Sequence, residues 1–275
     1  MERLVAYFST IPSSHRALIL AGGIAGFWLW EMAEPLFRFE HRKGRHALVN
    51  LFFTATTILV NFALAFVLLR ASDWAVAREV GLRFVLPPVP AWLDLLVGLL
   101  VLDLISAWLA HWVQHQTPML WRLHLVHHSD THVDTTTANR HHPGESVVRF
   151  AFTTAAVVAV GAPMWMVFLY QSLSVVLSQF NHANIALPPA VDRAISWVLV
   201  SPDMHKVHHH YVLPHTDSNY GNLFSVWDRL FGTFRTMERG ALTYGIDTHF
   251  PAAEHATIGA LLTMPLRKGT RRLVD

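Results

Sequence analysis

The feature that most constrains this chain is an uncharged apolar stretch, residues 47–69, ALVNLFFTATTILVNFALAFVLL. A membrane-spanning helix needs about 20 mostly apolar residues, so this stretch is long enough to cross a bilayer. The composition agrees, because only 15% of the residues are charged, whereas soluble domains carry about 25%. We therefore expect a membrane protein and not a soluble all-helical protein.

Three further stretches are apolar enough to be candidate spans: residues 17–33, 91–110 and 147–180. The last is too long for one span and is interrupted by Gly-Ala-Pro at 161–163, which predicts a helical hairpin or two half-spans. The expected fold class is therefore all-α. It is an integral membrane helical bundle of about four transmembrane segments, one of them the broken hairpin, forming a single domain over residues 1–275.

Basic residues between the first two spans set the expected orientation. The segment FRFEHRKGRH carries Arg38, Arg42, Lys43 and Arg45, and the positive-inside rule places such a loop in the cytoplasm. Following the later spans from there brings every histidine cluster described below to the same face. The sequence therefore predicts a histidine-rich cytosolic cap on the bundle.

Three short histidine clusters stand out: HWVQH at 111–115, HLVHH at 124–128 and HKVHH at 205–209. Helix positions i and i+4 share a face, so His111 and His115 can grip one metal together. Each triplet occupies i, i+3 and i+4, an arc that can divide its ligands between two neighbouring metals. Imidazole suits iron, copper, zinc and nickel. Since Pro118 separates the first two clusters, they are expected on different helical pieces.

The number of candidate ligands predicts two metals. The clusters supply eight histidines and His182 is a ninth candidate, whereas one tetrahedral zinc takes four ligands. No cluster holds a carboxylate, which argues against a glutamate-bridged di-iron site, and H-E-x-x-H is absent. The lack of cysteine excludes disulfides, iron–sulfur clusters and haem-thiolate centres. We expect a histidine-rich dinuclear site at the membrane surface.

Three residues outside these clusters are candidate partners of the ligands. Asp103 lies within a span, where an acid is a functional suspect, and either hydrogen-bonds a ligand imidazole or makes a polar helix contact. Asp228 either orients a ligand histidine or lies in a segment that packs the cap. His142 is either a partner of a ligand or structural. The other histidines are expected at the surface or membrane interface: His15, His41, His46, His132, His210, His215, His249 and His255.

The order H-x-x-x-H, H-x-x-H-H and a distant H-x-x-H-H resembles the fatty acid hydroxylase/sterol desaturase superfamily of integral membrane oxygenases. TTANRHHPGE at 136–145 and NYGNLFSVWDRLFGTF at 219–234 strengthen the resemblance, which covers roughly residues 45–235. It implies a catalytic region at 111–235. Residues 236–275 are a tail, whose stretch from residue 256 is partly apolar with a basic end and is expected along the inner membrane surface. The resemblance also implies two iron ions bound by His111, His115, His124, His127, His128, His182, His205, His208 and His209.

The same resemblance implies an activity. The protein is expected to hydroxylate an unactivated C–H bond of a fatty acyl chain or sterol-like lipid, using O₂ and external electrons. A separate reductase, ferredoxin or cytochrome would supply the electrons. Desaturation by the same site is an open alternative, and a membrane metal-binding or transport protein and a zinc-dependent hydrolase are alternatives of other classes. The absence of clustered Lys and Arg argues against a nucleic-acid partner. The RHHP segment leaves open whether His141 or His142 does the family's work.

Overall fold

The computed structural model describes residues 1–40, 42–248 and 251–267, and it is helical, as predicted. Within those residues, β-type pairing is limited to isolated bridges. The long elements are α2 (Ser13–Ala33), α3 (Lys43–Ala77), α8 (Pro143–Val160), α9 (Met164–His182) and a continuous rod of α5 (Ala91–Asp103), the π-helical turn η1 (Leu104–Leu109) and α6 (Ala110–Gln116). The short elements are α1 (Glu2–Ser9), α4 (Leu82–Val85), α7 (Pro118–His128), η2 (Thr135–Asn139), α10 (Pro189–Ile195), α11 (Pro202–His208), η3 (His215–Asp217), α12 (Val226–Leu230), η4 (Arg239–Ala241), α13 (Ala252–His255), α14 (Ile258–Thr263) and η5 (Met264–Leu266).

Three helical segments of the described chain are long and apolar enough to cross a membrane: Lys43–Val85, Ala91–Gln116 and Pro143–Val160. Each overlaps a stretch that the sequence predicted as a span. Helices α2 and α9 are long enough but less apolar, because their sequences carry charged or polar residues such as Glu31 and Gln179. By length and composition the count is therefore three, where the sequence suggested about four.

The predicted break at residues 161–163 is confirmed. Helix α8 ends at Val160, and Gly161 follows in the left-handed region with φ 71°. A Cβ on Gly161 would lie 2.6 Å from the Val80 carbonyl oxygen, so the turn needs glycine. Pro163 then precedes α9, which begins at Met164. The apolar stretch thus forms two separate helices.

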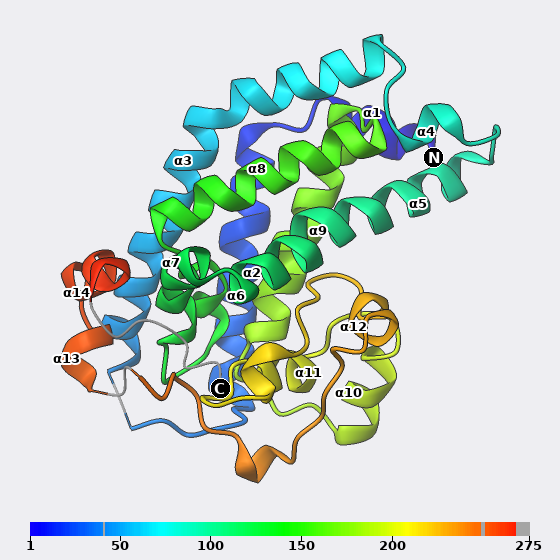
Figure 1. Cartoon of the computed structure of the whole chain (residues 1–275). Coiled ribbons are helices and arrows are strands. Elements are labelled where there is room, and N and C mark those ends of the chain that lie inside the picture. The colour runs from blue at the N-terminus through cyan, green and yellow to red at the C-terminus, as the bar shows by residue number, and fades with distance from the viewer. Residues whose placement is uncertain (41, 249–250, 268–275) are drawn as a thin grey trace.

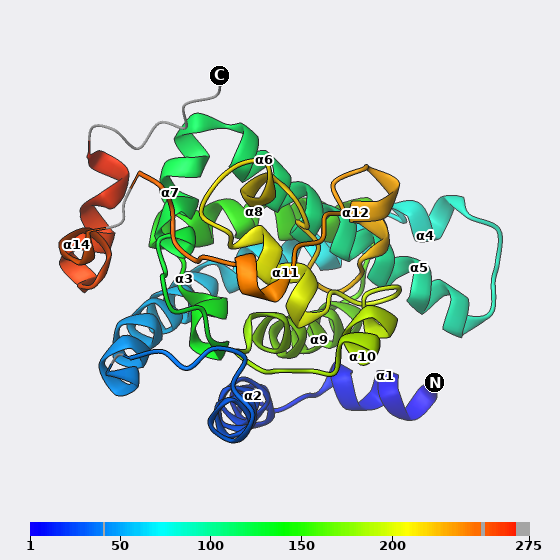
Figure 2. The same cartoon turned by 90° about the horizontal axis from the view of Figure 1, so that it is seen from below.

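The long helices make up one part of the molecule, and the histidine-bearing elements gather at one end of it (Figure 1). Viewed from that end, α11 lies over the bundle with α6, α7 and α9 close to it (Figure 2). An apolar core joins α3, α5, α8 and α9 through buried residues such as Leu68, Leu102, Val157 and Met166. The bundle therefore holds the ends of these four helices together.

The C-terminal part of the described chain packs against the body. Leu261 and Met264 are fully buried and pack with Phe53, Trp121 and Leu125. Residues 258–266 thus close one side of α7, where the sequence predicted a tail lying along the membrane; residues 268–275 of that tail fall outside the described residues.

A buried arginine ties this end of the bundle together. Arg140 is 2% exposed. Its Nε donates to the Val126 carbonyl at 3.0 Å, its Nη1 to Asn50 Oδ1 at 2.9 Å and its Nη2 to the His255 carbonyl at 2.9 Å. These bonds connect η2 and its following loop to α7, α3 and α13. Buried polar groups need such partners, so the four segments are fixed relative to one another.

A second connection starts from Glu31 at the end of α2. Its carboxylate is buried and accepts the backbone N–H groups of Thr135 at 2.7 Å and Asn184 at 2.9 Å, with Lys43 Nζ at 2.8 Å. The acid in the first apolar stretch therefore anchors the chain directly after His182. This contact explains why α2 carries a charge at that position.

The Arg140 network generates a stability prediction. Replacing Arg140 by Met keeps an unbranched side chain but removes the three hydrogen bonds that these buried oxygens accept from the guanidinium, which should lower the free energy of unfolding by about 3 kcal/mol. Thermal unfolding in detergent would measure this. The matched control is Arg45→Met, since Arg45 is exposed on α3. Equal unfolding temperatures for the two variants would contradict the role given to Arg140.

Candidate metal centre

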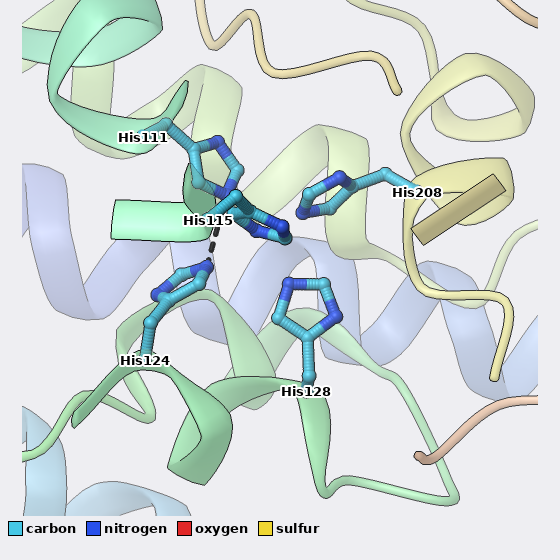
Figure 3. Close-up of side chains that lie close together, drawn as sticks. All are labelled: His111, His115, His124, His128 and His208. Carbon is cyan, nitrogen blue, oxygen red and sulfur yellow. Dashed lines mark hydrogen bonds between the residues drawn. The ribbon is translucent and has the colours of Figure 1, made fainter. Parts of the chain in front are cut away.

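All nine histidines predicted as ligands lie together, in two groups. The first contains His111, His115, His124, His128 and His208, and the second contains His127, His182, His205 and His209. Every member is buried, and within each group the atoms able to bind metal all lie within 4.8 Å of one another. The five rings of the first group point toward a common centre (Figure 3).

The spacing of the triplets explains how they divide. On α7, the i and i+4 residues His124 and His128 join the first group, while the i+3 residue His127 joins the second. At the α11 triplet the division is reversed: His205 and His209 join the second group and His208 the first. Residues i and i+4 share one helix face, whereas i+3 points to its side. The two helices therefore each contribute to both groups.

Hydrogen bonds set the orientation of five of these rings. Nδ1 of each lies next to an oxygen that can only accept, so Nδ1 carries the proton and Nε2 keeps its lone pair in the neutral ring. The partners and distances are Tyr220 O at 2.9 Å for His111, Asp217 Oδ1 at 3.0 Å for His115, Glu145 Oε1 at 2.8 Å for His124, Ser178 O at 2.7 Å for His182 and Ser218 O at 2.7 Å for His208.

The consequence is that lone pairs face one another. Nε2 of His111 lies 3.0 Å from Nε2 of His124, and with both Nδ1 atoms protonated the two neutral rings have no proton to share there. In the second group, Nε2 of His182 lies 3.1 Å from Nε2 of both His127 and His205, and its one lone pair cannot accept a full hydrogen bond from each. A cation between such nitrogens replaces these contacts with coordination. The donor set therefore fits metal ions bound by imidazole.

Burial keeps the remaining rings neutral as well. Desolvation, reinforced by the neighbouring histidines, lowers the pKa of His127, His128, His205 and His209 well below the ordinary value. Among the described residues, neither ring nitrogen of His128 or His209 has a hydrogen-bond partner. Buried polar atoms without a partner are costly. Metal coordination would satisfy them.

Glu145 is a site residue that the sequence reasoning missed. Its side chain is fully buried at the start of α8, where it accepts from His124 and lies 3.7 Å from His141 Nε2. The available signal was its position, since an acid at the beginning of an apolar span needs a partner. His141 packs against His127 with ring centroids 4.9 Å apart. Its neighbour His142 caps α8 instead, accepting the Gly144 N–H at 3.0 Å.

Of the two alternatives left open for Asp103 and for Asp228, the structure has contacts with loop backbone and not with a ligand histidine. Asp103 accepts from the backbone N–H groups of Leu223 at 3.2 Å and Phe224 at 3.1 Å. Asp228 accepts from the N–H of Tyr220 at 2.8 Å, and the Tyr220 carbonyl in turn orients His111. The loop after η3 crosses the rod here, and its buried N–H groups require acceptors. Both acids hold the loop that contains Tyr220, and the Tyr220 carbonyl orients the ligand His111.

Of the histidines expected at the surface, His210 and His255 are buried and His46 is partly buried. His46 donates from Nε2 to the Asp130 carboxylate at 2.9 Å, and His210 accepts the Thr243 N–H through Nδ1 at 3.2 Å. His255 is 9% exposed. These predictions were wrong because sequence alone did not reveal the polar partners. His15 is exposed as predicted, His132 and His215 are partly exposed, and His41 and His249 lie outside the described residues.

A small recess adjoins both histidine groups. Its walls include His111, His124, His127, His182 and His205 from the two groups. Further along the membrane-spanning part, Ala107, Arg149 and Ser178 line the same space. A ligand in this recess would touch both groups at once.

Comparisons with known proteins agree with this arrangement. Residues 95–233, half of the chain, match the family described as fatty acid hydroxylase. The chain is 25% identical over 154 residues to ornithine lipid hydroxylase OlsE of Rhizobium tropici, covering 56% of this chain and 45% of the relative. It is 30% identical over 142 residues to alkylglycerol monooxygenase of Xenopus tropicalis, covering 50% and 30%.

A longer match is found to methylsterol monooxygenase 1-3 of Arabidopsis thaliana, 23% identical over 195 residues, covering 70% of this chain and 66% of the relative. The chain thus spans less than half the length of the first two relatives. No solved structure matches. The family match, the apolar helices and the histidine groups together establish a metal-binding membrane protein.

The contact between Glu145 and His124 generates a prediction. Glu145→Gln preserves size but removes the carboxylate that fixes His124, so metal affinity should fall by about 10- to 100-fold. Competition with a chelator would measure the change. Glu238→Gln, which alters an exposed glutamate, is the matched control. Unchanged affinity in Glu145→Gln would show that His124 needs no carboxylate.

The burial of the histidines generates a pH prediction for the metal-free protein. Their pKa lies below the ordinary 6.5, so below pH 6.5 the unfolded chain binds protons that the folded chain does not. Stability should therefore fall as pH decreases, by about 1.4 kcal/mol per pH unit for each such histidine. Thermal unfolding between pH 7 and 5 would measure it, with a shallower slope expected for His128→Asn. A flat profile would contradict neutral burial.

Proposed function

The chain belongs to the fatty acid hydroxylase family, and from this premise we propose that it is a membrane oxygenase that hydroxylates an unactivated C–H bond of a lipid. O₂ and external electrons are its co-substrates. The observation that carries the proposal is the pair of adjoining all-histidine groups at the end of apolar helices, with a recess beside both. The names of the relatives favour hydroxylation over desaturation.

We propose that each group holds one iron ion. His111, His115, His124, His128 and His208 would bind one, and His127, His182, His205 and His209 the other. Five and four imidazoles support iron better than zinc, because zinc sites close at four ligands and have no redox chemistry. Bound iron would supply the activation of O₂ that a lipid C–H bond requires.

The protein's own residues supply orientation and exclusion of water. Glu145 and the Tyr220 carbonyl fix the rings of His124 and His111, and Asp228 fixes Tyr220. These contacts leave Nε2 of both rings available as a ligand atom. The recess lies on the membrane side of the histidines, which suits a substrate that arrives from the bilayer.

Location and partners follow from the same proposal. Arg38, Arg42, Lys43 and Arg45 support a cytoplasmic position for the histidine groups. A separate reductase, ferredoxin or cytochrome on that side would deliver electrons. The catalytic region would comprise residues 111–235 of a single 275-residue domain. Its relatives are named for ornithine lipid, alkylglycerol and methylsterol, so the proposed substrate class is lipid.

Metal analysis tests the proposal first. Protein extracted gently from cells grown with iron should carry two irons per chain, measured by mass spectrometry. His128→Ala and His209→Ala each remove a ligand of a different group and should each lower the count. Cells exposed to ¹⁸O₂ should then accumulate a lipid with one added ¹⁸O, absent in both variants. One zinc per chain, retained in both variants with no labelled lipid, would favour the hydrolase alternative and overturn the oxygenase.

A further inference from the structure

Arg149 is a cation inside an otherwise apolar helix. It is the one basic residue of α8, whose 18 residues are apolar enough to span a membrane. An ionisable residue in such a segment is costly and marks a functional position by default. Its side chain lines the recess beside the histidines and is 29% exposed, so a ligand can reach it.

The guanidinium makes one long ion pair in the part of the chain that the structure describes. Its Nη1 lies 3.9 Å from Glu145 Oε1, which is too long for a hydrogen bond. That same oxygen already accepts from His124 Nδ1 at 2.8 Å. Arg149 therefore keeps donors available toward the recess. A guanidinium presents them in a planar fork that matches carboxylate and phosphate oxygens.

The charge of the surroundings favours an anion. The neighbouring imidazoles are neutral donors and bring no negative charge, and bound metals would add positive charge. Within the described lining of the recess, no acidic side chain faces Arg149. Glu145 adds one negative charge, and that charge is engaged by His124. An oxyanion in the recess would therefore gain attraction from Arg149 without displacing a protein carboxylate.

The position of Arg149 along α8 places it near the histidine groups. Arg149 lies six residues into α8, about 9 Å from its start, and one turn beyond Glu145, which contacts His124. Ala107 and Ser178, one turn before His111 and His182 on their own helices, are small and leave space beside it. A group held by Arg149 is thus close to both histidine groups.

We propose that Arg149 binds the oxyanion of the substrate, a carboxylate or a phosphate. The substrate would then be an anionic lipid that is oxidised near its head group and not in the middle of its chain. This inference rests on the proposed function, because the bound lipid is a substrate only if the protein is an oxygenase. The anion site itself rests only on Arg149 and the recess.

Three ligands that share one C16 chain test the inference: palmitate, hexadecyl phosphate and neutral hexadecanol. Equilibrium dialysis with the purified metal-loaded protein in a neutral detergent would give each dissociation constant. At least one anion should bind about 10- to 100-fold more tightly than hexadecanol, as expected for a charge-assisted contact. Palmitate as the tighter ligand indicates a free fatty acid, and hexadecyl phosphate indicates a phospholipid-type head group.

Two substitutions of Arg149 test whether this side chain causes the anion preference. Arg149→Leu should abolish it and leave hexadecanol binding unchanged, while Arg149→Lys should retain part of it. Arg70→Leu is the matched control, since it removes a charge from α3 at an exposed site beside Phe66. Metal content equal to that of the unmodified protein verifies folding. If Arg149→Leu does not pass this check, the anion preference of Arg149→Lys is compared with that of the unmodified protein. An undiminished preference in Arg149→Lys would then contradict the inference.

Equal binding of the three ligands by the unmodified protein would overturn the inference, as would a preference that survives in Arg149→Leu. Binding requires no turnover, so the two proposals fail separately. An anion preference without ¹⁸O-labelled lipid contradicts the oxygenase and leaves the anion site standing. Labelled lipid without an anion preference contradicts this inference alone.

Discussion

The structure depends on nine buried imidazoles that converge in two groups. In the first group, Nε2 of His111 lies 3.0 Å from Nε2 of His124, and in the second, Nε2 of His182 lies 3.1 Å from Nε2 of both His127 and His205. The surrounding protein holds them there by accepting the opposite N–H of five rings on fixed oxygens. Folding energy from the apolar bundle is thus used to maintain an arrangement that only metal binding makes favourable.

Four acids within or beside the apolar segments help to hold the ligand histidines in position. Glu145 contacts a ligand directly, whereas Asp103 and Asp228 hold the loop that contains Tyr220. Glu31 does the same for the backbone that follows His182. Each is buried in a part of the protein where an unsatisfied charge would be costly. Asp103, Asp228 and Glu31 each accept two or more hydrogen bonds from N–H groups, and Glu145 accepts one from His124, which offsets this cost.

Helical spacing carried the sequence prediction far. It indicated the eight histidines of the three clusters, because these depend on neighbours within one helix, while Gly161 and Pro163 predicted the break at residues 161–163 and the family resemblance added His182. Contacts between residues far apart in the sequence could not be predicted from helical spacing. His46 was expected at the surface because nothing near it in sequence indicates Asp130, and the roles of Asp103 and Asp228 depend on where a distant loop crosses. Glu145 was missed for the same reason.

The reciprocal division of the two triplets has a consequence for biosynthesis. The first group lacks His208 and the second lacks His205 and His209 until this triplet has been made, so neither is complete on a nascent chain that ends before residue 208. The membrane helices precede that point. The bundle can therefore insert and pack before any metal is acquired in full, and loading becomes one of the last steps in producing the protein.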